Sequence, residues 1–379
     1  MFKRTEESKL TSWFFEIDRR LLYAVLLMIA IGMVFAVSAG SVAAERISKP
    51  WYFFIGKALP FYAIGIGTLF VASLFNKKNV LWLSVLNVVV GGLLLAVTVV
   101  SPHIVKGSAR FVAIGPLHIL PSDIMKPGFI ILTAWFLSEM RERFGEKMFM
   151  VKEAWKFRWF SWWTYLAVFL PTLGIIWNHP DVGTSLLYLG VLIAMMLIAG
   201  LPWSVFGLLV VGGVGILGLA YKIMPHVHNR IDALITGTGD TYQVTQSVQS
   251  IQHGGLFGRG DDAFIKQSLP DAHTDFIYAA IAEDLGAIMA CLLLALLIYV
   301  LKLLVTDAMN ARDKFVFYAV GGAAALFGIQ SCINLVSTLH LFAPKGMTLP
   351  FISYGGSSLI GFCLLFGMVL AIVREDKWK

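Results

Sequence analysis

Apolar runs of about 18–25 residues recur along this chain, which is the length a helix needs to cross roughly 30 Å of hydrocarbon. Hydrophobic residues make up 58% of the 379 positions, and charged residues only 14%. Runs this long and this poor in charge leave little room for a water-soluble domain. The sequence therefore predicts an all-α, polytopic integral membrane protein.

Hydropathy places about ten spans along the chain. They cover roughly residues 21–43, 52–74, 80–100, 121–138, 158–176, 183–199, 204–222, 276–302, 314–337 and 350–373. We interpret residues 1–379 as one membrane domain, with an N-terminal segment 1–20, a large loop 223–275 between spans seven and eight, and a tail 374–379. The N-terminal segment lacks a small-residue cleavage site, so we expect the first span to be retained.

Basic residues are concentrated on alternate connections, which is the positive-inside pattern. With the N-terminus inside, the cytoplasmic connections receive Arg19, Arg20, Lys77, Lys78, Arg141, Arg143, Lys147, Lys152, Lys156, Arg158, Lys302, Arg312, Lys314, Arg374, Lys377 and Lys379. Both termini are thus expected in the cytoplasm. This topology accounts for the net charge of +7 without nucleic acid, whose binding would need a basic soluble domain.

The three cysteines, Cys291, Cys332 and Cys363, all fall inside predicted spans and form no CxxC pair. We interpret them as packing thiols rather than as a disulfide or metal framework.

Asp275 occupies the most informative position, where the long external loop meets the eighth span. A helix N-terminus favours an ionised carboxylate, which can act as a base or as a metal ligand. A capping role for Asp271 and Asp275 stays open. His273 could hydrogen-bond a substrate or orient Asp275, and a structural role is equally open for it.

Two further carboxylates, Glu283 and Asp284, lie about two turns deeper in the same span. Each would cost roughly 2.5–3.5 kcal/mol if left unpaired in hydrocarbon, so we expect a cavity or an ion pair around them. Lys126, inside the fourth span, is a candidate partner for one of them.

Other motifs in the long loop indicate less. The glycines of 254–260 resemble a phosphate-binding loop, but no βαβ unit surrounds them, so flexible backbone is the better interpretation. His226 and His228 with Asp232 or Asp240 could ligate zinc, although histidines spaced in this way in a loop are usually solvated.

Two more external segments carry cations. Residues 101–121 contain Lys106 and Arg110 and lead through Pro121-Ser122-Asp123 into the fourth span, as at a helix start. Residues 344–358 contain Lys345 and a run of glycine and serine, which suits close packing or an irregular helix start beside a cavity. These cations would suit an anionic ligand.

Together these segments resemble the SEDS family of bacterial cell-wall glycan polymerases, and within it the FtsW branch more than the RodA and SpoVE branches. The similarity spans about residues 15–373. It rests on Lys106-Gly-Ser-Ala-Arg110, Pro121-Ser122-Asp123, Pro180 to Ser185, Tyr242-Gln243-Val244 with Ser247, Gly254-Gly255, Leu269 to Asp275, and Gly346 to Ser358. The chain departs from the family pattern at Phe111, Leu120, Asp123, His179 and Asp284, and most of these changes are chemically mild.

The resemblance implies a peptidoglycan glycosyltransferase that polymerises lipid II at the outer face of the bacterial cytoplasmic membrane, expected at the division septum. Asp275 would be the base of an inverting transfer. The implied diphosphate or substrate contacts are Lys106, Ser108, Arg110, Gln243, Lys266, His273, Lys345 and Ser353. A divalent cation, Mg²⁺ or Mn²⁺, is expected, with Asp275 as a possible ligand. The implied partners are a class B penicillin-binding transpeptidase and other division membrane proteins.

Two other classes stay open at this stage. A lipid II flippase would also need many spans and internal ionisable groups, but it should place polar residues through to the inner face. A non-catalytic division scaffold would tolerate loss of Asp275.

Overall fold

The computed structural model describes residues 9–46, 48–50, 52–100, 103–105, 108–114, 117–156, 160–178, 182–223, 228, 232, 242–341 and 346–378. Each of the ten predicted spans contains one helix. These are α2 (Arg19–Arg46), α3 (Phe53–Ser73), α4 (Lys77–Val100), α5 (Pro121–Phe144), α6 (Trp162–Asn178), α7 (Val182–Ile198), α8 (Trp203–Ile223), α12 (Ile277–Met309), α13 (Lys314–Thr338) and α14 (Gly356–Trp378). A short helix α1 (Lys9–Glu16) precedes them, and two 3-10 turns, η1 (Gly145–Lys147) and η2 (Lys152–Trp155), follow α5.

Seven of the described helices are long and apolar enough to cross a membrane: α2, α3, α4, α8, α12, α13 and α14. Helices α6 and α7 are apolar but only 17 residues long. Helix α5 is less apolar because Asp123 and Lys126 lie within its first turns. The chain is thus a helical, multi-pass membrane protein.

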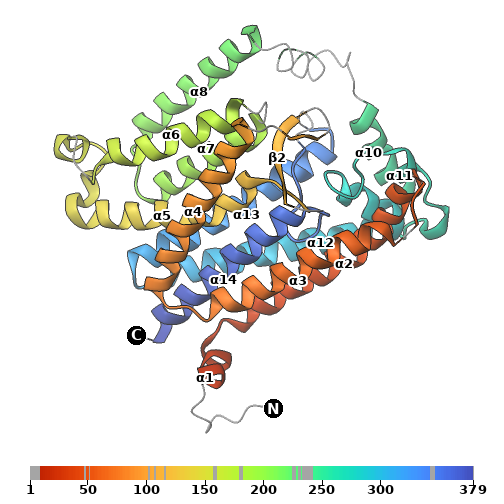
Figure 1. Cartoon of the computed structure of the whole chain (residues 1–379), viewed down its shortest axis with the longest axis horizontal. Helices are drawn as coiled ribbons and strands as arrows, with labels where there is room; N and C mark the ends of the chain where they lie inside the picture. Colours follow the sequence, from red (N-terminus) through yellow and green to blue (C-terminus); the bar gives the residue numbers. More distant parts are fainter. Residues whose placement is uncertain are drawn as a thin grey trace.

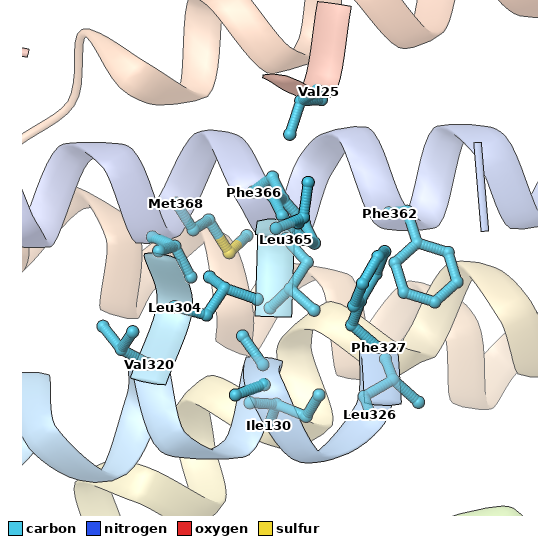
Figure 2. Packing of buried hydrophobic residues seen from close by; sticks show 14 of the residues in the cluster. Val25, Ile130, Leu304, Val320, Leu326, Phe327, Phe362, Leu365, Phe366 and Met368 are labelled. Carbon is cyan, nitrogen blue, oxygen red and sulfur yellow. The ribbon is translucent and has the colours of Figure 1, made fainter. Parts of the chain in front are cut away.

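Helix α14 is the centre of the packing and contacts α3, α4, α5 and α13. Figure 2 shows Phe362, Leu365 and Phe366 of α14 facing Phe327 of α13, with the Phe327 and Phe366 rings 5.8 Å apart. Between α14 and α3 the backbones approach closely, since a Cβ on Gly367 would lie 2.6 Å from the Leu69 carbonyl oxygen. Small residues at helix contacts are what dispersion-driven packing in lipid requires.

A small sheet corrects the prediction of an all-α protein. Strands β1 (His103–Val105), β2 (Ser108–Ile114) and β3 (Leu117–Ile119) pair antiparallel in the order β1-β2-β3. Val105 pairs with Ser108, and Ile114 pairs with Leu117, so only two residues separate each pair of strands. In the sequence, Gly107 and the dipeptide Gly115-Pro116 punctuate short segments that contain Val and Ile, as is typical of hairpins.

The described part of the large loop is mostly helical. It contains α10 (Tyr242–Gly254), the 3-10 turn η3 (Gly260–Asp262) and α11 (Ile265–Ser268). We call residues 242–268 the cap. In Figure 1, α10 and α11 lie at one end of the long helices, and the C-terminus lies at the other. The last predicted span begins later than expected, since residues 346–355 precede the start of α14 at Gly356.

At the end opposite the cap, Lys377 of α14 joins two other parts of the chain. Its Nζ lies 2.9 Å from Oδ2 of Asp18, before α2, and 2.9 Å from Oδ1 of Asp307, near the end of α12. The other oxygen of Asp18 accepts the backbone N–H groups of Arg20 and Leu21 at 3.1 Å each. Asp18 therefore caps α2 while it anchors α14.

This geometry predicts a pH-dependent contribution to stability. Burial raises the pKa of Asp18, but Lys377 and the two N–H groups outweigh it, so the pKa lies below the usual 3.8. A lowered folded-state pKa gives stability that is complete above about pH 4 and is lost as the pH falls through the folded value. Asp18→Asn should cost about 1 kcal/mol at pH 7, because Lys377 is partly solvated, and less at pH 3. Thermal unfolding in detergent at both pH values measures this.

The matched control is Glu153→Gln, which removes an exposed pair with Lys156. It should change the midpoint little at either pH. An equal loss for Asp18→Asn at pH 7 and pH 3 would contradict an electrostatic origin.

Candidate active site

A tight turn places Asp275 at the start of α12. The carbonyl of Asp271 accepts the N–H groups of Thr274 and Asp275, both at 3.0 Å, and of Phe276 at 3.4 Å. Asp271 has a φ of 53°, a left-handed conformation that aspartate tolerates better than most residues. The helix begins at Ile277, so the Asp275 carboxylate stands just before the positive end of its dipole.

The irregular segment 346–355 fastens this turn from the opposite side. Ser353 Oγ donates to the Thr274 carbonyl at 2.6 Å and accepts the N–H of Leu349 at 2.8 Å. The N–H of Tyr354 donates to the carbonyl of His273 at 2.9 Å. The Ser353 hydroxyl thus makes two hydrogen bonds to the backbone, one in the turn and one in the 346–355 segment. It holds the turn against this segment, and we assign Ser353 a positioning role.

Asn334 of α13 joins the turn to the same segment. Its Nδ2 donates to the carbonyl of Asp275 at 2.8 Å and to that of Met347 at 2.7 Å. A Cβ on Gly346 would lie 2.8 Å from Oδ2 of Asp275, so the half-buried carboxylate rests directly against this glycine. The backbone of Asp275 is therefore fixed, and a carboxylate on a fixed backbone is what a general base requires.

His273 lies in an aromatic cluster beside Asp275. Its ring centroid is 5.2 Å from that of Phe54 in α3 and 5.5 Å from that of Tyr354. Phe54 and Tyr354 meet edge to face at 5.7 Å. The cluster links the start of α3 to the turn and fixes the orientation of the imidazole, two residues from the carboxylate.

Lys126 does not pair with Glu283 or Asp284, which corrects the sequence-based expectation. Its Nζ, buried in the protein, lies 2.6 Å from Oδ1 of Asp123, one turn earlier in α5, and 2.9 Å from Oε1 of Gln330. Nε2 of Gln330 donates to the carbonyl of Thr348 at 2.9 Å. The counter-ion of Lys126 is therefore Asp123, from the same helix. Through Gln330, hydrogen bonds connect Lys126 to Thr348 in the 346–355 segment.

Glu283 and Asp284 pair with the cap instead. Glu283, 0% exposed, lies 2.9 Å from Nδ1 of His253, and Asp284 forms a buried ion pair with Lys266. Asp284 thus has a cationic partner, as expected of a carboxylate at this depth, and Glu283 has a histidine partner, and neither partner is the predicted Lys126. Since the Lys266 ammonium is buried against Asp284, we leave Lys266 out of the proposed diphosphate contacts.

The remaining candidates lie around this centre or outside the described residues. Arg110 is half-buried on β2, with its guanidinium carbon 5.5 Å from the Phe111 ring centroid. Gln243 is half-buried in the first turn of α10. Ser108 begins β2, but its side chain lies outside the described residues, as do Lys106 and Lys345.

Metal ligands are sparse in the part of the chain that the structure describes. No group of three His, Cys, Asp or Glu side chains converges there. His228 lies 3.0 Å from Asp232, as an i, i+4 pair, and His226 and Asp240 are outside the described residues.

Sequence reasoning missed Gln330, Asn334 and the role of Gly346. Gln330 and Asn334 are four residues apart in an apolar helix and therefore lie on one face. A polar stripe of this kind inside a span indicates a functional interior, and it was the available signal. The role of Gly346 depends on a contact distant in sequence, which no local pattern reveals.

The family model described as "Cell cycle protein", for FtsW, RodA and SpoVE, matches residues 18–378. The chain belongs to this family. The probable peptidoglycan glycosyltransferase FtsW of Caulobacter vibrioides is 33% identical over 99% of this chain and 93% of that protein. The protein of the same description from Thiomicrospira cyclica is 31% identical over 95% of this chain and 92% of that protein.

Solved structures share the fold. A chain of a peptidoglycan synthase complex aligns with a TM-score of 0.76 at 23% identity, over 96% of this chain and 99% of that one. The rod shape determining protein RodA of Thermus thermophilus aligns with a TM-score of 0.67 at 24% identity, over 95% of this chain and 97% of that one.

Proposed function

We propose that this protein is a peptidoglycan glycosyltransferase that polymerises lipid II. The observation that carries the proposal is the position of Asp275, whose backbone is held by the Asp271 turn and Asn334 and whose carboxylate lies against Gly346. Family membership supports the same activity, because relatives at 33% and 31% identity are described as probable peptidoglycan glycosyltransferases.

In the proposed reaction, Asp275 takes the proton from the 4-hydroxyl of the acceptor sugar. The oxygen then forms a bond to C1 of the donor, while the bond from C1 to the lipid diphosphate breaks and the diphosphate leaves with the electron pair. Attack opposite the leaving group inverts C1. Positive charge near the departing diphosphate lowers the barrier, and we propose Arg110 with Lys106 and Lys345 for this role.

A divalent cation would fit the same site. Mg²⁺ is usually held by one or two carboxylates together with substrate phosphates, and one carboxylate is what the Asp275 site offers. Such an ion, Mg²⁺ or Mn²⁺, would neutralise the diphosphate. No step assigned to Asp275 above depends on it.

We infer that all ten apolar helices span the cytoplasmic membrane, with both termini in the cytoplasm and the cap outside. The alternation of basic connections supports this topology. We also propose a class B penicillin-binding transpeptidase and other division membrane proteins as partners at the septum. The similarity of fold to a chain of a synthase complex that coordinates polymerization and crosslinking supports such an assembly.

The direct test is reconstitution. Purified protein is combined with its candidate transpeptidase, lipid II and Mg²⁺ or Mn²⁺, with the transpeptidase active site blocked, and glycan strands are resolved by size. We expect strands that require this chain. Transport of lipid II across vesicles without strand synthesis would instead favour a flippase.

Topology has its own test. Cysteine is placed at Asp262, exposed in the cap, or at Met150, exposed after α5, in a background without Cys291, Cys332 and Cys363. Since the cap is expected outside and the segment after α5 inside, a membrane-impermeant thiol reagent added to intact cells should label only position 262. Labelling of position 150 alone would put the proposed site on the wrong face.

A further inference from the structure

Two helices of the cap, α10 and α11, converge on Glu283 of α12. Its carboxylate accepts the hydroxyl of Ser250 and lies 2.9 Å from Nδ1 of His253, both on α10. It also accepts the N–H groups of Ile265 at 2.8 Å and Lys266 at 2.7 Å, at the start of α11. A fully buried carboxylate is costly unless its lone pairs are filled, and here three donors fill them, with Nδ1 of His253 as a fourth contact.

The next residue extends the attachment. Asp284 pairs with Lys266 of α11 through Oδ1 and accepts the hydroxyl of Ser38 of α2 at 3.0 Å through Oδ2. The cap is therefore joined to α12 and α2 at one level, about 12 Å along the helix from Asp275.

Around Gly286, backbone groups of α12 form hydrogen bonds with the backbone of the cap. Gly286 has φ 82° and ψ 175°, which interrupts the helix. The N–H of Ala287 donates to the carbonyl of Gly255 at 2.8 Å, and the N–H of Arg259 donates to the carbonyl of Glu283 at 2.9 Å. The glycine-rich loop is therefore a docked surface, which corrects its interpretation as flexible backbone.

The cap also packs on the turn that carries Asp275. Ile251 of α10 contacts a buried cluster of Leu269, Ala272, Phe276, Ala279 and Ala280. Only residues 269–274 separate the cap from Asp275 in the chain. The cap and the Asp275 turn therefore share one packed cluster, while Asn334 and Ser353 hold the turn from the other side. A displaced cap would remove one of the contacts that hold the turn.

We propose that Glu283 is a positioning residue, whose carboxylate docks the cap on α12 and thereby sets the place of Asp275 in the reaction. The inference rests on the proposed glycosyltransferase function. Its physical reason is that exchanging one carboxylate oxygen for an amide NH₂ turns a donor toward two of the four groups around Glu283 and removes their acceptor. A shift of about 1 Å at a reacting group can cost roughly 10²-fold in rate.

The experiment compares Glu283→Gln with Asp262→Asn, a matched control that neutralises an exposed acid of the same cap. Docking is measured without activity, through Ser247→Cys in the cysteine-free background. Ser247 lies on α10, is fully buried and donates to the carbonyl of Thr338 at 2.9 Å. Turnover is measured per competent site, and the number of competent sites is taken from the amount of lipid II bound per protein.

We expect Glu283→Gln to raise the labelling rate of Cys at 247 at least tenfold. The value of kcat per site should fall at least tenfold, while KM for lipid II changes less than threefold. Asp262→Asn should match the parent in labelling rate, in kcat per site and in KM. A purely structural role for Glu283 would lower the number of competent sites and leave kcat per site unchanged, which would overturn the proposal, as would unchanged labelling.

Two further variants keep these outcomes separate. If Glu283→Gln does not fold, Ser250→Ala removes one donor to the carboxylate and should give the same changes in smaller measure. Asp275→Asn should be inactive with labelling like the parent. If the parent itself makes no glycan strands, the proposed function fails, and labelling still reports whether Glu283 docks the cap.

Discussion

Asp275→Asn should lower glycan-strand synthesis by roughly 10²–10⁴-fold, the range that a positioned general base contributes. The change keeps the size of the side chain and removes the ionisable oxygen. Because backbone groups and Asn334 hold the turn, the variant should fold and insert normally. Strand synthesis is measured in the reconstituted assay, with expression and thermal midpoint measured on the same preparation.

Asp271→Asn is the matched control, four residues earlier in the same turn. Asparagine tolerates the positive φ of this position, and the carbonyl that closes the turn is unchanged. Its activity should stay within a few-fold of the parent. Comparable activity in the two variants, both well folded, would remove Asp275 from the base role.

Gly286→Ala should be the most destabilising single substitution predicted for this chain. The conformation at Gly286, φ 82° and ψ 175°, is essentially restricted to glycine, and forcing another residue into it costs about 1–3 kcal/mol. A Cβ there would also lie 2.3 Å from the Leu256 carbonyl oxygen and 2.4 Å from the Gly258 nitrogen. We expect a loss of at least about 3 kcal/mol in unfolding free energy, measured by denaturation in detergent.

Gly92→Ala provides the comparison, because nothing lies within 4 Å of a Cβ at that position in α4. Alanine within a helix should leave stability equal or slightly higher. If Gly286→Ala behaved like Gly92→Ala, the backbone of the cap would not be docked at the break in α12.

The helices were predictable because a helix that crosses a membrane needs a long apolar run, and such runs are visible in a single sequence. The place of Asp275 was predictable too, since it follows a long polar loop and precedes an apolar run. The partner of Lys126 was not, because a buried lysine can be neutralised by any carboxylate in reach and sequence gives no distances. Asp123, one turn away, was the local candidate that the prediction passed over.

The sheet and the cap were missed for different reasons. Strands β1, β2 and β3 are three to seven residues long, too short for periodicity to separate from loop. The glycines of 254–260 looked flexible because their partner, the break at Gly286, lies some thirty residues later and is itself hidden within a predicted span. Contacts of this kind depend on tertiary structure.

The docked loop also determines where a reporter can be inserted. A tag between residues 254 and 259 would displace the carbonyl acceptors of the Ala287 and Ile288 N–H groups, and backbone N–H groups that lose their acceptors are costly. Asp262, exposed in the adjacent 3-10 turn, lies outside these bonds. A short epitope there would mark the cap for imaging and leave the hydrogen bonds between the cap and α12 in place.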